Sequence, residues 1–321
     1  MNYLLIRLGF DTAVHFGASD SAQSLATSQD HLPADTLFSA LCHTALQLYG
    51  PAGIEQLCTW VKSGELLLSD MLPWRGDDCF LPRPCALAAE SGESEGARVK
   101  AMKKLLWIPA LSFDKYAAAL RSGRTYDAEP VSFGLACEST RASLGQKEEA
   151  MPYRVGLFRF EDNCGLYVIA ALCSHGQKEM LMALFRALGL GGIGGKVSSG
   201  CGKFHVVDAV LLKEGTDPQA RWLYGALKEN RGHSLLLSAS LPRDEELDKA
   251  MDGARFRLLR RSGFVASDTY SPEPMKKRTQ YFFRAGSVFL NRYEGALYQV
   301  GGSGSHPVYR YGRPLFLGVK L

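Results

Sequence analysis

The chain has 321 residues, of which 46% are hydrophobic and 22% are charged, and its formal net charge is +4. This composition is typical of a soluble globular protein with length for two domains and with cores that need no disulfide staples. The small net charge excludes an evenly basic surface, so any nucleic-acid footprint has to come from local clustering of charge.

The cysteines and the N-terminus narrow the class of protein further. Eight cysteines are scattered without a CxxC pair, and no histidine array has zinc-ligand spacing, so we expect reduced thiols, no metal site and no cofactor. The apolar run at the N-terminus is broken by Arg7 and is too short for a signal peptide or a membrane span. We therefore expect a cytoplasmic protein with no membrane contact.

The first two thirds of the chain predict strands and helices in a recognisable order. Residues 3–10 alternate as a half-buried strand does, and Asp35 stands where the N-cap of an amphipathic helix ending at Gly50 is expected. A helical pattern over residues 177–190 precedes a glycine-rich segment and a strand at 203–212. With the segments between them, this order is that of the ferredoxin-like fold.

Residues 113–151 lose this periodicity, and we interpret them as an inserted, projecting hairpin. They precede two strands, 155–160 and 165–173, which are expected to pair with each other. Beyond residue 214 the order looks similar. The elements predicted there are helices at 219–229 and 244–251 and strands at 234–241, 256–265, 281–290 and 308–319. We therefore expect an α+β protein with two ferredoxin-like domains, residues 1–213 and 214–321.

The most informative segment is the glycine-rich loop at residues 189–203, GLGGIGGKVSSGCGK. Glycines let backbone N–H groups approach an anion closely, and the serines and lysines add donors and charge, so phosphate is the expected ligand. A GxGxxG spacing is present, but a helix precedes it and a strand follows, the reverse of the Rossmann order. The P-loop pattern fails because Leu190 and Val197 occupy two required positions. A flexible surface connection remains the alternative.

A second feature is a cluster of positive charge between Arg255 and Arg284, where eight basic residues face two acidic ones. Strand alternation places Arg255, Arg257 and Arg261 on one side, which predicts a polyanion or an acidic partner, with a solvated strand face as the alternative. The aromatic run 281–283 beside Arg284 could stack bases, and alternation predicts that Phe282 points away from Tyr281 and Phe283.

A glycine-rich loop between the last helix and the last strand of a ferredoxin-like fold resembles that of the RAMP proteins of CRISPR systems. Four further segments, LPADTLFSAL, LLLSDMLPW with LPRP, RSGFVAS followed by FFRAGSVF, and HPVYRYGRPLF, span most of the chain. They are similar to the subunit that caps the 5′ end of the guide RNA (crRNA) in type III-A (Csm) effector complexes.

The resemblance implies a non-catalytic subunit that grips the 5′ repeat-derived tag of the crRNA between two domains. It also implies contacts to the large palm-domain subunit and to a backbone RAMP subunit, and a thumb hairpin, for which 113–151 is the candidate, that kinks the guide. Asp35 and Thr36 are assigned first to helix capping and second to RNA contact. The residues expected to contact RNA are Gly191, Gly192, Gly194, Gly195, Lys196, Ser198, Ser199, Gly200, Lys203, Asp35, Thr36, Arg141, Arg257, Arg260, Arg261, Lys276, Lys277 and Arg278.

Two alternatives stay open. RAMP ribonucleases that mature precursor crRNA without a metal use a histidine near the first helix, and His15, His31 and His43 lie in that region. The chain could also be the equivalent subunit of a type III-B complex.

Overall fold

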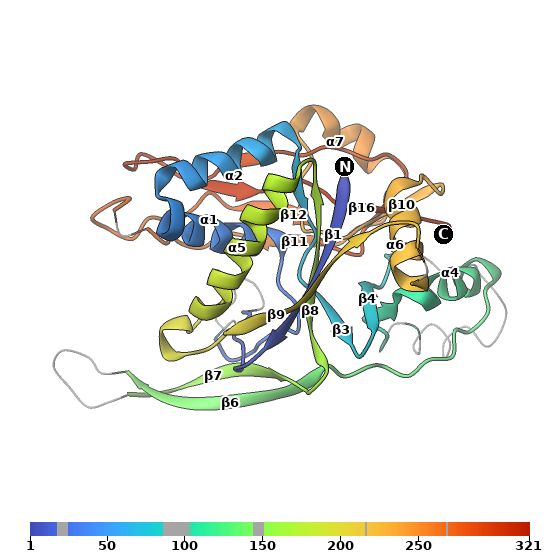
Figure 1. Ribbon diagram of the computed structural model, residues 1–321, viewed down its shortest axis with the longest axis horizontal. Helices are drawn as coiled ribbons and strands as arrows, with labels where there is room; N and C mark the ends of the chain where they lie inside the picture. The colour runs from blue at the N-terminus through green and yellow to red at the C-terminus, as the bar shows by residue number, and fades with distance from the viewer. Residues whose placement is uncertain (18–24, 86–101, 103, 144–150, 216, 268) are drawn as a thin grey trace.

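The computed structural model describes residues 1–321 except 18–24, 86–101, 103, 144–150, 216 and 268. The fold is mixed α+β and is built on one antiparallel sheet with the strand order β5–β4–β3–β8–β1–β9, in which β2 also pairs with β8 (Figure 1). Its strands are β1 (Asn2–Phe10), β2 (Leu66–Leu68), β3 (Leu72–Arg75), β4 (Asp78–Pro82), β5 (Trp107–Pro109), β8 (Cys164–Leu172) and β9 (Phe204–Leu212).

The central strands β1 and β8 are buried on both faces. Leu4, Ile6 and Leu8 of β1 enter one core cluster, whereas Leu5 enters the other. All nine residues of β8 are buried. The sequence predicts a half-buried strand at 3–10, and the second face is also covered because later parts of the chain pack against it.

Three helices cover the first face of the sheet: α1 (Ala34–Tyr49), α2 (Pro51–Ser63) and α5 (His175–Gly191). Pro51 starts α2 because its fixed φ and missing N–H suit the first helical turn, and Gly64, with φ of 78°, ends it. Helix α5 begins with a capping box in which Ser174 and Gln177 satisfy each other's backbone N–H groups. No helix within the described ranges is long and apolar enough to cross a membrane.

The second face of the sheet is covered by elements from both sides of residue 214. They are the 3-10 turn η1 (Ala110–Ser112), α4 (Phe113–Ser122), α6 (Pro218–Lys228), β10 (His233–Leu236) and β16 (Phe316–Val319). Leu223 of α6 and Leu317 of β16 are fully buried in the same cluster as Leu5 and Tyr167. Residues before and after the expected boundary therefore share one core.

The remaining C-terminal elements are α7 (Asp244–Met251), β11 (Leu258–Arg261), β12 (Gln280–Phe283), β13 (Val288–Phe289), β14 (Leu297–Gln299) and β15 (Tyr309–Tyr311). Helix α7 lies at the expected residues, whereas the strands are shorter than the sequence predicts. The expected strand at 281–290 is split between β12 and β13 at Gly286, whose φ is 92°. A β10-centred sheet has the order β13–β10–β16, and β11–β12 and β14–β15 form separate two-stranded ribbons.

The projecting hairpin begins and ends later in the chain than the expected 113–151. Helix α4 is part of the core, because Phe113, Tyr116 and Leu120 are buried there. The hairpin is formed by β6 (Gly134–Ser143) and β7 (Met151–Phe160), which stand out from the body in Figure 1. Residues 144–150 of the expected thumb lie outside the described residues. Strand β7 pairs with β6 rather than with β8, so the expected pairing of 155–160 with 165–173 is wrong.

Candidate nucleic-acid interface

The glycine-rich loop connects α5 to β9, as the sequence predicts. Four of its glycines, Gly192, Gly194, Gly200 and Gly202, have positive φ, and Lys196 adopts φ of 63°. At Gly194 an added Cβ would lie 2.8 Å from the carbonyl oxygen of His15, so a side chain is excluded there. Several positions in the loop therefore require glycine, because the backbone is left-handed there or because a neighbouring group leaves no room for a side chain.

Most backbone N–H groups of the loop bond within the protein. Ile193 donates to the Gly202 carbonyl at 2.9 Å, Gly195 to the His15 carbonyl at 2.9 Å, and Gly202 to the Ala13 carbonyl at 2.9 Å. Those of Gly194, Lys196, Val197 and Ser198 make no hydrogen bond within the described part of the chain. The side chains of Ser198 and Ser199 are exposed beside them. The donors free for an anion are thus concentrated at residues 194–199.

The β6–β7 hairpin lies against this loop. Arg141 of β6 and Tyr153 of β7 are cross-strand partners. Lys196 Nζ lies 3.4 Å from the Tyr153 hydroxyl and 5.0 Å from the centre of its ring, and Arg141 Nη2 lies 3.7 Å from Cys201 Sγ. The structure therefore brings Arg141 and Lys196, two residues expected to contact RNA, to the same place.

A buried histidine joins the hairpin to the loop. His15 Nδ1 lies 2.7 Å from the Gly156 carbonyl oxygen of β7, and the His15 ring is so close to Gly195 that an added Cβ there would lie 2.6 Å from it. His15 and Tyr153 are therefore structural members of the site that the sequence does not reveal. The contacts of His15 with Gly156 and of Tyr153 with Lys196 depend on the register of the hairpin, which local sequence patterns do not reveal.

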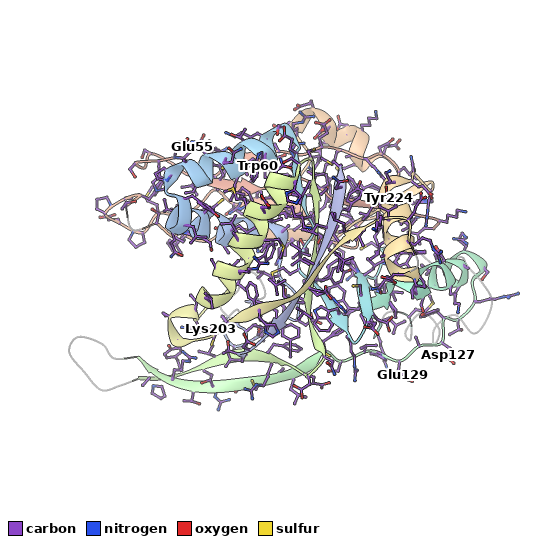
Figure 2. All side chains as sticks on the ribbon, viewed as in Figure 1. Glu55, Trp60, Asp127, Glu129, Lys203 and Tyr224 are labelled. Atoms are coloured by element: carbon purple, nitrogen blue, oxygen red, sulfur yellow. The ribbon has the colours of Figure 1, made fainter. Side chains whose placement is uncertain are left out.

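Lys203 is the last residue of the loop and directly precedes β9. Its side chain is exposed, and its backbone N–H donates to Thr12 Oγ1 at 3.0 Å. Figure 2 shows Lys203 at the lower left, on the side of the hairpin and far from Tyr224 of α6. Its position next to the loop agrees with the expected one.

Asp35 does not cap helix α1. The N-cap position is Pro33, and the first N–H group of the helix, that of Ala34, is bonded by Asp70 Oδ1 at 2.7 Å. Asp35 lies one residue further into the helix, where Arg261 Nε contacts its Oδ2 at 2.7 Å and Arg261 Nη2 donates to Thr36 Oγ1 at 2.7 Å. The expected capping role of Asp35 and Thr36 is therefore wrong, because both side chains bind Arg261.

The basic segment divides into inward and outward residues. Arg261 points inward to Asp35, and Lys277 is half-buried, with its pKa lowered by burial and by the nearby charge of Arg310. The exposed members are Arg255, Arg257, Arg260, Lys276 and Arg278. The expected basic strand face, with Arg261 beside Arg255 and Arg257, is not formed because β11 begins only at Leu258 and turns Arg260 outward.

The aromatic run of β12 follows the expected alternation only in part. Tyr281 is 57% exposed, whereas Phe282 and Phe283 are both buried. Phe283 is the last residue of the strand and packs on Phe256 and Phe289 in a third core cluster. Only Tyr281 is therefore available for stacking.

The three histidines near the first helix do not form a common site. His15 packs under the loop, His31 pairs with Asp30 at 2.9 Å, and the pKa of His43 is lowered by partial burial and by Lys277. Among the residues that the structure describes, no group of three or more His, Cys, Asp or Glu side chains could hold a metal ion.

Comparison with known proteins identifies the family. Residues 229–319 match the family model described as the CRISPR Csm4 C-terminal domain. The chain is 37% identical over 321 residues to the CRISPR system Cms protein Csm4 of Mycobacterium tuberculosis, covering 99% of this chain and 98% of that protein. It is 27% identical over 330 residues to the protein of the same name from Streptococcus thermophilus, covering 100% of both chains.

Two solved structures share the fold over nearly the whole chain. One is a Csm3–Csm4 subcomplex of the type III-A CRISPR-Cas interference complex, with a TM-score of 0.65, 16% identity and 99% of both chains covered. The other is a Csm1–Csm4 cassette in complex with pppApA, with a TM-score of 0.62, 18% identity and coverage of 100% of this chain and 99% of that one. The chain therefore belongs to the Csm4 family, the RAMP-family subunits of type III-A CRISPR Csm complexes.

Proposed function

We propose that this chain is a non-catalytic, cytoplasmic subunit that holds the 5′ repeat-derived tag of the crRNA in a type III-A interference complex. The observation that carries the proposal is the meeting of the β6–β7 hairpin with the glycine-rich loop. Arg141, Tyr153 and Lys196 combine two cations and an aromatic ring beside the N–H groups of Gly194 and residues 196–198, which are unbonded in the described part of the chain. Such a combination suits phosphates and unstacked bases.

The subunit would bridge a large palm-domain subunit to the backbone subunits. The related proteins of known structure are paired with Csm1 in one case and with Csm3 in the other, and the likeness in fold extends over nearly the full length. Equivalent partners are proposed here on that basis.

Two RAMP domains of ferredoxin-like design, residues 1–213 and 214–321, form the proposed framework. The strand order β9–β1–β8–β3, with α1 and α2 before β3 and α5 before β9, supports this design in the first domain. In the second, β10 lies between β13 and β16 and is followed by α7, which matches the design in part.

The test is a triple change, Lys196→Ala with Ser198→Ala and Ser199→Ala, in the full chain assembled with its complex. The three side chains contribute little to the core, so the fold should stay intact while the 5′ tag binds more weakly. The measurement is the affinity for a guide RNA carrying the tag, compared with the same RNA carrying a scrambled 5′ end. A matched control is Lys115→Ala, an exposed lysine on α4 at the opposite side of the molecule (Figure 1).

Unchanged affinity and unchanged preference for the tag in the triple variant would remove the glycine-rich loop from the RNA interface. Cleavage of precursor crRNA by the purified protein in EDTA would instead favour the metal-independent ribonuclease.

A further inference from the structure

The basic segment forms an arm that extends beyond its regular strands. Strand β11 pairs with β12, and the two backbone segments continue to hydrogen-bond beyond these strands. The Lys277 N–H donates to the Gly263 carbonyl at 2.8 Å. Val265 N–H then donates to the Met275 carbonyl at 2.9 Å. We call residues 258–265 and 275–283 the arm. It points to the same side of the molecule as the β6–β7 hairpin (Figure 1).

The arm carries two exposed pairs of an aromatic ring and a cation. Arg260 and Tyr281 are cross-strand partners in β11–β12, and the Tyr281 side chain is 57% exposed. Phe264 and Lys276 are bridge partners further along, where Lys276 Nζ lies 5.8 Å from the ring centre and Phe264 is 54% exposed. Exposure of both rings has no explanation in the folding of the chain, because neither contributes to a core.

The two pairs are spaced along an extended ribbon. Phe264 follows Arg260 by four residues, which corresponds to about 13 Å in a regular strand. The pairing register shifts between Arg261 and Phe264, where Gly263 has φ of 100°, and both pairs are exposed on either side of this shift. One extended polymer could therefore contact both pairs at different units along its length.

Arg260 and Lys276, the cations of the two exposed pairs, differ from the inward-pointing Arg261 in their ion pairs. Arg261 is neutralised by Asp35, whereas neither Arg260 nor Lys276 forms an ion pair with a carboxylate among the described residues. Two exposed cations beside two exposed rings are the combination that binds a single-stranded nucleic acid, because bases stack on the rings and phosphates meet the cations.

We infer that the arm is a second RNA contact, in which Tyr281 and Phe264 stack unpaired bases of the guide and Arg260 and Lys276 hold the adjacent phosphates. The inference rests on the proposed function, since it takes the crRNA as the strand. It adds a mode of binding that tolerates any sequence, because every base presents a π-face. Lys276 favours RNA over a protein partner, since lysine is depleted at protein interfaces.

The experiment compares two double variants of the full chain, alone and in the assembled complex. Tyr281→Leu with Phe264→Leu removes both rings and keeps apolar bulk, and we expect about tenfold weaker RNA binding per ring with an unchanged salt dependence. Arg260→Gln with Lys276→Gln keeps side-chain length and removes both charges. It should flatten the slope of log K against log salt by about 1.4.

The probe is a tagged single-stranded guide RNA, with the same strand annealed to its complement as a comparison. Stacking requires unpaired bases, so the ring variant should lose affinity for the single strand and little for the duplex. The control for the ring variant is Tyr49→Leu, at the exposed end of α1. The control for the charge variant is Lys115→Gln with Arg221→Gln, which replaces one exposed residue on α4 and one on α6.

Equal RNA affinity of the ring variant and its control would overturn the stacking role. Intact RNA binding with loss of assembly with the large subunit would show instead that the arm is a protein-docking surface. The loop variant Lys196→Ala with Ser198→Ala and Ser199→Ala, measured in the same assay, separates the two proposals. If the loop variant loses affinity for the tagged RNA and the two arm variants do not, the arm inference fails and the proposed function stands.

Discussion

The buried carboxylate of Asp70 connects residues 1–213 to residues 214–321. Asp70 is fully buried, and its Oδ1 accepts the N–H groups of Ala34, at the start of α1, and of Ala239, each at 2.7 Å. Because the two donors lie on opposite sides of residue 214, this side chain fixes α1 against the C-terminal part. Burial raises the pKa of Asp70 to about 6.

Asp70→Ala should lower the free energy of unfolding by about 2–4 kcal/mol, because two buried N–H groups lose their acceptor. Asp70→Asn should cost much less, since its amide oxygen can accept both bonds. Chemical denaturation of the two variants checks this. Equal losses for alanine and asparagine would mean that the charge, and not the acceptor, matters.

The raised pKa of Asp70 also predicts a pH dependence. Between its ordinary pKa near 4 and the folded value of about 6, the folded state holds the proton more tightly than the unfolded state. Stability from this group is therefore greatest at acid pH and is lost as pH rises through 6, by about 3 kcal/mol in all. The measurement is the difference in unfolding free energy between wild type and Asp70→Asn from pH 4 to 7, and a constant difference would contradict the assignment.

At the scale of elements, the β6–β7 hairpin is separable from the core. Ser139 and Val155 are cross-strand partners, and Val14 and His15 hydrogen-bond to β7 at Phe158 and Gly156. Replacing residues 140–154 by an Asn-Gly turn should leave the thermal unfolding temperature within a few degrees, because a two-residue turn suits an antiparallel pair. The shortened protein should release the 5′ end of the guide, since Arg141 and Tyr153 are removed.

Nuclease protection of the first guide nucleotides in the assembled complex measures this release. Arg154→Ala is the control, because its pair with Glu138 is exposed on the same hairpin. Full protection with the shortened hairpin would exclude its proposed thumb role.

The sequence predicts some elements well and others only in outline, for physical reasons. Alternation and helical periodicity are local, so β1, α5, β9 and the loop between α5 and β9 lie where they are expected. The first N–H group of α1 is bonded by Asp70, a residue far from it in the chain, whereas local patterns point to Asp35 and Thr36. The direction of Arg261 likewise depends on Asp35, which belongs to another element. Which cations face solvent could therefore not be predicted.

At the scale of the whole molecule, the shared core predicts that the two parts depend on each other. A chain ending at residue 213 would expose Leu5, Tyr167 and Ile169, which share one buried core cluster with residues of α6 and β16. Residues 1–213 alone should therefore aggregate, and co-expression with residues 214–321 should restore solubility. Size-exclusion chromatography checks this, and a monomeric, cooperatively unfolding 1–213 fragment would contradict it.

The position of β1 has a consequence for synthesis on the ribosome. Strand β1 is made first, yet Asn2 pairs with Leu172 and Tyr3 with Leu212, so both of its neighbours are made much later. At about 5–20 residues per second, the apolar segment NYLLIRLGF waits roughly 10–30 s for its first partner strand. A nascent chain stalled before β8 should therefore be held by chaperones that bind extended hydrophobic segments, and a chain whose β9 has left the exit tunnel should be released by them.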